Sequence, residues 1–265
     1  MKAMILAAGL GTRLRPLTND RPKALVEVNG RTLLEITLSG LRTAGVREVI
    51  VNVHHFAGMV LDFLKANNNF GMHIEVSREE TLLDTGGGLK RAAWFFLEGA
   101  SRSDEPFILH NVDVISTIDL GRMVRFHTEN QAAATLAVQD RKASRYLLFD
   151  RELQLCGRRL GRDQEAEIVR PVPELQEWAF SGIHIISPHV LTMMDEEEVF
   201  SIISSYLRLA ARGEKIMAFR ANEYYWRDLG TPESVAQAAE DLKHPTRRHG
   251  DTETRRKPKS RKSLD

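Results

Sequence analysis

A glycine-rich turn directly after the first apolar segment constrains this chain more than any other feature. Residues 2–7 form a short apolar run, and the sequence continues Ala8-Gly9-Leu10-Gly11-Thr12. Glycines at the end of a strand let backbone N–H groups approach an anion and cradle phosphate oxygens. The segment therefore predicts a β-strand whose carboxyl end carries a phosphate-binding turn, with Ala8, Gly9, Gly11 and Thr12 as nucleotide-binding residues.

Two widespread nucleotide-binding patterns do not account for this turn. A dinucleotide fingerprint needs a third glycine where the chain has Leu14, and an acidic residue near the end of the second strand, where it has His54 and His55. A P-loop needs Gly-Lys-Ser/Thr, which the sequence lacks. Instead, Arg13 follows the turn, and Lys23 comes later, after a proline. Two fixed cations beside a phosphate cradle suit a triphosphate that loses pyrophosphate, so these two are the candidate catalytic residues.

Strand-like and helix-like segments alternate through the first half of the chain. Residues 48–53, 73–77 and 107–110 are apolar and partly β-branched, whereas residues 33–44, 60–64 and 89–96 have helical spacing. This alternation predicts a Rossmann-like α/β fold, with a mainly parallel sheet and helices on both faces. Ligands of such sheets bind at the carboxyl ends of the strands.

A change of rhythm near residue 132 predicts a smaller lobe that completes the sheet. Short extended segments follow, with little helix until after Pro188. We expect one domain over residues 1–242, divided into parts of about 1–131 and 132–242. Residues 243–265 are basic and almost free of apolar side chains, which is typical of a disordered tail.

Composition excludes several classes of protein. The net charge of the 265 residues is +1, which gives no overall attraction to nucleic acid or membranes. The single cysteine, Cys156, excludes an intramolecular disulfide framework and a cysteine-only zinc site. No apolar stretch approaches the ~20 residues of a membrane span, and the N-terminal run is too short for a signal peptide. We expect a cytoplasmic protein with neither nucleic-acid nor membrane partners.

Three further segments carry chemically informative residues. Thr85-Gly86-Gly87-Gly88 opens a predicted helix, and consecutive glycines imply that a ligand packs against bare backbone. Asp113 directly follows a buried strand, and Asp228 precedes Gly-Thr-Pro near the last predicted helix. Two carboxylates together with phosphate oxygens and water make a Mg²⁺ site.

The run L-A-A-G-x-G-x-R-L-x-P-L-T…P-K resembles the sugar-1-phosphate nucleotidyltransferases, over roughly residues 1–242. The resemblance implies transfer of a nucleotidyl group from an NTP to a sugar 1-phosphate, with Mg²⁺ as cofactor. It implies that Asp113 and Asp228 bind the metal, although Val112 stands where the family usually has glycine. Thr85, Gly86 and Gly87 would then form the loop whose backbone reads the base.

Within this family the chain is most similar to the N-acetylmuramate-1-phosphate uridylyltransferase branch. The features that it shares with this branch are Phe180-Ser181-Gly182-Ile183, Asp-Thr-Gly-Gly-Gly and the lack of an appended acetyltransferase repeat. This implies UTP as the donor and Asn111, Ser181 and Gly182 as sugar-binding residues. Many relatives carry a Glu-Lys-Pro whose lysine neutralises the sugar phosphate. Here residues 165–173 read EAEIVRPVP, and only Arg170 stands near the expected place.

Other functions remain open from the sequence. One is a guanylyltransferase that acts on heptose or mannose 1-phosphate, and another a transferase for a non-sugar phosphate such as phosphocholine. A non-catalytic nucleotide-binding regulatory subunit is disfavoured, since such a subunit can lose the metal carboxylates and still bind nucleotide. We expect a monomer or a small homo-oligomer, and a reaction that needs no general base, because the attacking phosphate is already ionised.

Overall fold

The four strands predicted in the first half of the chain form the parallel centre of one sheet in the computed structural model. The structure describes residues 1–97, 104–161 and 164–243. In spatial order the four strands are β5 (His73–Arg78), β4 (Glu48–Val53), β1 (Lys2–Leu6) and β6 (Phe107–Asn111). β1 runs parallel to both β4 and β6, and Leu6 lies in register with Asn111. The turn after β1 and the residues after β6 therefore leave the same edge of the sheet, side by side.

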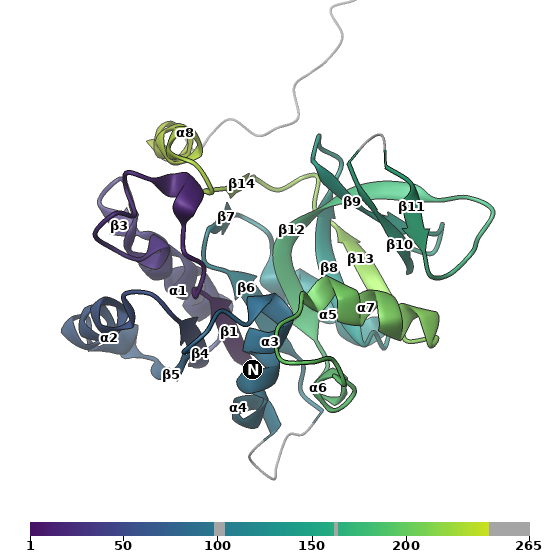
Figure 1. Cartoon of the computed structure of the whole chain (residues 1–265), viewed down its shortest axis with the longest axis horizontal. Helices are drawn as coiled ribbons and strands as arrows, with labels where there is room; N and C mark the ends of the chain where they lie inside the picture. The colour runs from purple at the N-terminus through teal and green to yellow at the C-terminus, as the bar shows by residue number, and fades with distance from the viewer. Residues whose placement is uncertain (98–103, 162–163, 244–265) are drawn as a thin grey trace, which may run out of the picture.

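Helices cover both faces of this sheet (Figure 1). One hydrophobic cluster includes α1 (Leu33–Thr43), α2 (Ala57–Ala66) and α5 (Leu120–Glu129). The other includes α3 (Asp84–Arg91), α4 (Ala93–Leu97), α6 (His189–Thr192) and α7 (Ile202–Ala211). Successive strand residues divide between the clusters, as the pleat requires, and the predicted Rossmann-like α/β fold is confirmed.

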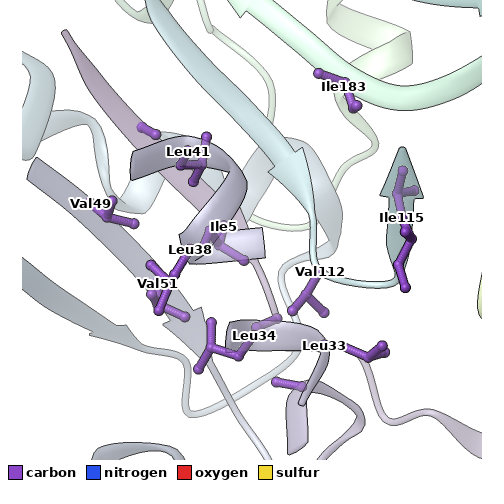
Figure 2. Packing of buried hydrophobic residues seen from close by; sticks show 14 of the residues in the cluster. Ile5, Leu33, Leu34, Leu38, Leu41, Val49, Val51, Val112, Ile115 and Ile183 are labelled. Atoms are coloured by element: carbon purple, nitrogen blue, oxygen red, sulfur yellow. The ribbon is translucent and has the colours of Figure 1, made fainter. Parts of the chain in front are cut away.

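Helix α1 shows how the sequence sets this packing. The Thr32 hydroxyl accepts the backbone N–H of Glu35 at 3.1 Å and caps the first turn. Leu34 and Leu38 recur at helical spacing and are fully buried. In Figure 2 these leucines lie over Val51 of β4, in the layer that also contains Val112. The residues after β6 are thus anchored in the core immediately before Asp113.

The second half of the chain continues the same sheet. β12 (Gln176–Ile186) is antiparallel to β6 through its last residues and to β9 (Arg145–Phe149) through its first. β8 (Ala134–Gln139) pairs with β12, and β13 (Ile216–Arg220) runs parallel to β8. β10 (Leu155–Leu160) and β11 (Ala166–Ile168) extend the antiparallel side beyond β9. The smaller lobe predicted from residue 132 thus corresponds to strands that share the central sheet, and its separate identity stays a prediction.

Several short elements were not predicted. β7 (Val114–Ser116) pairs with β14 (Trp226–Asp228), and β2 (Glu27–Val28) pairs with β3 (Arg31–Thr32). Three 3₁₀ turns lie at η1 (Thr12–Leu14), η2 (Lys23–Leu25) and η3 (Asn68–Gly71). The helical pattern at residues 89–96 is divided between α3 and α4 rather than continuous.

The last described element is α8 (Pro232–Lys243). Lys243, the first residue assigned to the tail, ends this helix, and residues 244–265 of the predicted tail lie outside the described residues. Within the described stretches, no helix has the length and apolar character needed to cross a membrane.

Candidate active site

The two glycines of the turn after β1 differ in their surroundings: Gly9 has free space beside it, and Gly11 packs against Thr18. A Cβ added to Gly9 would have no atom within 4 Å, so its backbone faces free space. Gly11 has φ +64°, and a Cβ there would lie 3.0 Å from Thr18 Cγ2. The Thr18 hydroxyl also donates to the Gly11 carbonyl at 2.8 Å. Gly11 therefore fixes the shape of the turn, while Gly9 leaves backbone accessible to a ligand.

Predicted residues from four segments line one cavity of about 440 Å³ at the carboxyl ends of β1 and β6. They are Ala8, Gly9, Lys23, Thr85, Asn111 and Asp113. The remaining candidates, Gly11, Thr12, Arg13, Gly86, Gly87, Ser181, Gly182 and Asp228, do not line it. The cavity is where the sequence placed the nucleotide, and Arg13 and Asp228 lie close by.

The β7–β14 pair brings the two predicted metal carboxylates together. Asp228 lies in register with Val114, and the Leu229 N–H donates to the Asp113 carbonyl at 2.8 Å. Burial and the negative charge of Asp113 raise the pKa of Asp228, whereas Lys23 and Arg13 act in the opposite direction. Residues far apart in the chain thus share one electrostatic site.

Each carboxylate has a cation beside it. The Lys23 ammonium pairs with Asp113, and each side chain is 13% exposed. A Cβ added to Gly230 would lie 2.6 Å from Asp228 Oδ1 and 2.9 Å from Arg13 Nη2. Gly230 therefore lets the Arg13 guanidinium approach Asp228, and the Gly230 N–H donates to the same carboxylate at 2.9 Å.

These carboxylates fit a divalent cation. Their oxygens are the hard ligands that Mg²⁺ prefers, and the charge of Asp113 acts to raise the pKa of Asp228, a repulsion that a shared cation relieves. Among the described residues no cluster of three or more histidine, cysteine or acidic side chains suits a metal. Mg²⁺ commonly takes one or two protein carboxylates and completes its shell with phosphate and water.

The second glycine segment differs from its prediction. The Gly86 and Gly87 N–H groups both donate to the Phe200 carbonyl, at 2.9 and 3.3 Å. Added Cβ atoms would collide with the Phe200 ring and the Glu198 carbonyl. The bare backbone of these glycines contacts another part of the protein, and only Thr85 of the predicted base-binding residues lines the cavity.

The predicted sugar-binding residues Asn111, Ser181 and Gly182 lie next to one another and are called the sugar wall below. Of the three, Asn111 alone lines the cavity. Gly182 has φ +73° at a break in the register of β12, and a Cβ there would lie 3.0 Å from Asn111 Nδ2. Ser181 is fully buried, and its carbonyl accepts the Trp226 indole N–H at 2.7 Å. Asn111 Oδ1 is buried with no hydrogen-bond partner in the described part of the chain. Ser181 and Gly182 thus support Asn111 and Trp226 in this structure rather than facing the cavity.

Arg170, the arginine nearest to the expected lysine in the sequence, is paired within the protein. Its guanidinium pairs with Asp150 at 3.2 Å and donates to the Leu155 carbonyl at 3.2 Å, on the antiparallel side of the sheet. A different arginine, Arg141, interacts electrostatically with Asp228. No motif marked Arg141 in the sequence.

Sequence reasoning also missed a buried polar pair that lines the cavity. Asn52 Nδ2 donates to Glu79 Oε1 at 2.6 Å, and Glu79 Oε2 accepts the Leu83 N–H at 3.1 Å. Asn52 Oδ1 accepts the Ala7 N–H at 2.7 Å. These bonds hold the end of β1 and the loop before Thr85 together. The available signal was a polar residue inside the otherwise apolar run Glu48–Val53.

The comparisons with known proteins identify the family of the chain. Residues 2–244 match the family model described as nucleotidyl transferase. The chain belongs to this family. The chain is similar to the N-acetylmuramate α-1-phosphate uridylyltransferase of Caulobacter vibrioides, at 35% identity over 89% of this chain and 94% of the relative. A mannose-1-phosphate guanyltransferase of Yarrowia lipolytica is 32% identical over 88% of this chain, which spans 61% of that relative.

Solved structures share the fold. The structure of HddC from Yersinia pseudotuberculosis complexed with GMP-PN has a TM-score of 0.71 at 23% identity, covering 91% of this chain and 99% of that chain. A putative glucose-1-phosphate thymidylyltransferase from Bacillus anthracis has a TM-score of 0.74 at 18% identity, covering 91% and 94%. Family membership makes the protein an enzyme of the NTP:sugar-1-phosphate nucleotidyltransferase class, with nucleotide and sugar-phosphate substrates.

Proposed function

We propose that the enzyme transfers a uridylyl group from UTP to N-acetylmuramate 1-phosphate. The observation that carries this proposal is the Caulobacter uridylyltransferase, which matches at 35% identity over 94% of its own length. Guanylyltransferases match at about the same level, 32% for the Yarrowia protein, and therefore supply the competing assignment. The products would be UDP-N-acetylmuramate and pyrophosphate.

The reaction is a substitution at the α-phosphorus of the NTP. An oxygen of the sugar phosphate attacks the α-phosphorus, and the bond from this phosphorus to the bridging oxygen of the pyrophosphate breaks. The nucleophile is already anionic, so no side chain has to remove a proton. Catalysis then depends on positioning and on neutralising charge.

The open turn suits the triphosphate. Backbone at Ala8 and Gly9 borders the cavity, and Gly11 and Thr12 shape the turn that continues into η1. We assign Arg13 and Lys23 to the pyrophosphate that leaves, because their positive charges lie beside the turn and gain strength as negative charge develops there. Of the second loop we retain Thr85 as a contact for the base, since Gly86 and Gly87 bind Phe200.

Asp113 and Asp228 would hold the Mg²⁺ ion. Mg²⁺ held by these carboxylates would neutralise charge on the phosphates. The carboxylates themselves fix where the phosphates come to rest. Lys23 and Arg13 lower the pKa of Asp228 against the effects of burial and Asp113, and so favour its ionised state.

Pyrophosphate release from each of four NTPs with a panel of sugar 1-phosphates tests the assignment. The panel contains the 1-phosphates of N-acetylmuramate, N-acetylglucosamine, glucose, mannose and a heptose. We expect the highest kcat/KM for UTP with N-acetylmuramate 1-phosphate. A tenfold or greater preference for GTP with mannose or heptose 1-phosphate would replace the uridylyl assignment by the guanylyl one.

A further inference from the structure

Arg141 lies in the short segment after β8, where two strands hold its guanidinium. Arg141 Nη2 donates to the Phe180 carbonyl of β12 at 2.6 Å. The guanidinium carbon lies 3.7 Å from the centroid of the Trp226 ring on β14, within cation–π distance. Trp226 is held in turn by its indole N–H bond to the Ser181 carbonyl. The orientation of the guanidinium plane is therefore set before any ligand arrives.

Among the described residues, no carboxylate contacts the Arg141 guanidinium closely enough to form an ion pair. Its buried Nε also has no hydrogen-bond partner in the described part of the chain. Other half-buried arginines are paired: Arg170 with Asp150 at 3.2 Å, and Arg227 with Asp241 at 2.8 Å. Burial lowers the pKa of Arg141, and the charge of Asp228 acts against that effect. A buried cation without a partner is costly, which points to an anion that binds there.

The surroundings of Arg141 match the place where the second substrate must lie. Its stacking partner, Trp226, stands two residues before Asp228 on β14. Its hydrogen-bond partner, Phe180, precedes Ser181 and Gly182, which support Asn111. Arg141 also borders a hollow of about 230 Å³ with Trp226 and Gln139, so it is accessible from outside. Arg141 therefore contacts the residue that precedes Ser181 in the proposed sugar wall and interacts electrostatically with Asp228, one of the proposed metal carboxylates.

We propose that Arg141 binds the 1-phosphate of the sugar substrate and takes over the charge that a lysine provides in relatives with Glu-Lys-Pro. This inference rests on the proposed function only in that the acceptor is a sugar 1-phosphate. One Nη2 hydrogen is committed to Phe180, so the Nη1 hydrogens and the second Nη2 hydrogen remain to donate to phosphate oxygens. An arginine fork held in one plane can give two parallel charge-assisted bonds, which a lysine cannot.

Steady-state kinetics of Arg141→Gln test this role. At saturating UTP and Mg²⁺, we expect the KM for the sugar 1-phosphate to rise by roughly 10- to 100-fold, while the KM for UTP stays within about twofold, because the lost interaction involves one substrate only. Arg141→Lys keeps the charge but not the planar fork. Its KM for the sugar 1-phosphate should therefore lie between those of Arg141→Gln and the wild type. An equal rise in both KM values, or an unchanged KM for the sugar 1-phosphate, would overturn the assignment.

Arg170→Gln is the matched control. It removes a half-buried arginine that is paired with Asp150, away from the carboxylate site. Its melting temperature reports what the loss of such an arginine does to stability, and its KM for the sugar 1-phosphate should stay unchanged. Thermal shifts with the sugar 1-phosphate alone, without nucleotide or metal, give a second measure. The shift should vanish in Arg141→Gln and persist in Arg170→Gln, and a persistent shift in Arg141→Gln would contradict the proposal.

The sugar panel separates a phosphate contact from a contact with the lactyl carboxylate of N-acetylmuramate. N-acetylglucosamine 1-phosphate lacks that carboxylate and is measured as substrate or competitive inhibitor. Equal losses for both compounds support phosphate binding, whereas a loss confined to N-acetylmuramate 1-phosphate would overturn it. If another sugar 1-phosphate is the acceptor, the N-acetylmuramate assignment fails, and the role of Arg141 is measured with that sugar instead. No transfer to any member of the panel by the wild type would overturn both proposals.

Discussion

The two glycine-rich segments use the same residue for opposite purposes. At Gly9 an added Cβ would meet nothing within 4 Å, and the backbone borders the cavity. At Gly86 an added Cβ would collide with the ring of Phe200, and the N–H binds the Phe200 carbonyl. One segment keeps backbone free for a ligand, and the other lets the chain between α6 and α7 pack closely on α3.

This difference shows that a glycine run indicates a close approach to backbone but not what approaches. Around Gly9 and Gly11 the structure also collects Arg13, Lys23 and Asp113, which are charged groups suited to phosphate and metal. Around the second segment it places Glu79 and Asn52, both buried, with Gly88 so close that a Cβ would lie 2.7 Å from Glu79 Oε1. The chemistry is therefore expected at the first segment, and stability at the second.

The largest effect should come from the carboxylates beside the first segment. Asp113→Asn and Asp228→Asn each keep the side-chain shape but remove one charge that would bind Mg²⁺. We expect kcat to fall on the order of 10³-fold or more in each, with the double variant scarcely worse, because the two act as a unit. Melting temperatures should hardly change.

Stopped-assay pyrophosphate release measures these variants, with Asp62→Asn on the exposed face of α2 as control. EDTA should abolish the activity of the wild type. Full turnover by either single variant at ordinary Mg²⁺ would remove the carboxylates from the mechanism and break the contrast between the two segments.

A smaller loss is expected for Arg13→Ala. Charge builds on the pyrophosphate oxygens as the bond to the α-phosphorus breaks, so a fixed cation there acts mainly on the transition state. We expect kcat to fall about 10²-fold, the scale for removing one preorganised electrostatic group. Arg15→Ala, an exposed arginine of the same loop, is the control. A change confined to KM would make Arg13 an ordinary binding residue.

The glycines themselves give the most direct comparison. Gly86→Ala should destabilise the fold by about 1–3 kcal/mol, because its Cβ overpacks against Phe200. Gly9→Ala should leave the melting temperature unchanged and raise the KM for the NTP, because its Cβ has room but borders the ligand cavity.

Urea unfolding and NTP kinetics are measured for both variants. Adding Phe200→Ala to Gly86→Ala should cost less than the sum of the two single changes. If Gly86→Ala is as stable as the wild type but loses nucleotide binding, the second segment contacts ligand after all.

The central fold was predictable because its signals are local. Apolar runs such as Glu48–Val53 and the helical spacing of Leu34 and Leu38 lie within single elements, and the turn after β1 is continuous in the chain. Lys23, Asp113 and Asp228 could be chosen because their types suit phosphate and metal and because the motifs around them resemble those of the nucleotidyltransferase family.

What the sequence did not reveal depends on contacts between distant segments. The β7–β14 pair is too short to show a period, yet it sets Asp228 against Asp113. The packing of Phe200 on Gly86 also joins separate elements. Arg141 carries no motif at all, and its importance follows from the absence of an ion pair in the described structure and from its stacking on Trp226.

The smallest effect per residue is expected on acidification, which tests whether the sheet carrying both glycine segments loses stability as one unit. Burial lowers the pKa of His110 and His127 to about 4 and that of His184 to about 3. Unfolding restores a pKa of about 6.5, so the unfolded chain binds protons first as the pH falls below that value. Stability is therefore intact above about pH 6.5 and declines toward pH 4. We expect a loss of about 1 kcal/mol for each histidine between pH 7.5 and 5.5.

Urea unfolding at pH 7.5, 6.5 and 5.5 measures this loss, with His55→Gln as an exposed control. Because His110 and His184 lie on β6 and β12, acid should weaken the sheet that carries both glycine segments. A pH-independent free energy of unfolding over this range would show that the histidines are not buried in their neutral form.

Strand β12 also limits how the molecule can open. Its first residues pair with β9 and its last with β6, so one continuous stretch of chain passes through both halves of the sheet. Any rotation of the β9–β11 side relative to β6 has to be absorbed inside this strand, where the register is already broken between Phe180 and His184. That break contains Gly182, in contact with Asn111, and follows the carbonyl that holds Arg141. A rotation that brings the β9–β11 side closer to β6 would then also move Gly182 and Arg141, so closure and alignment of the acceptor would occur together.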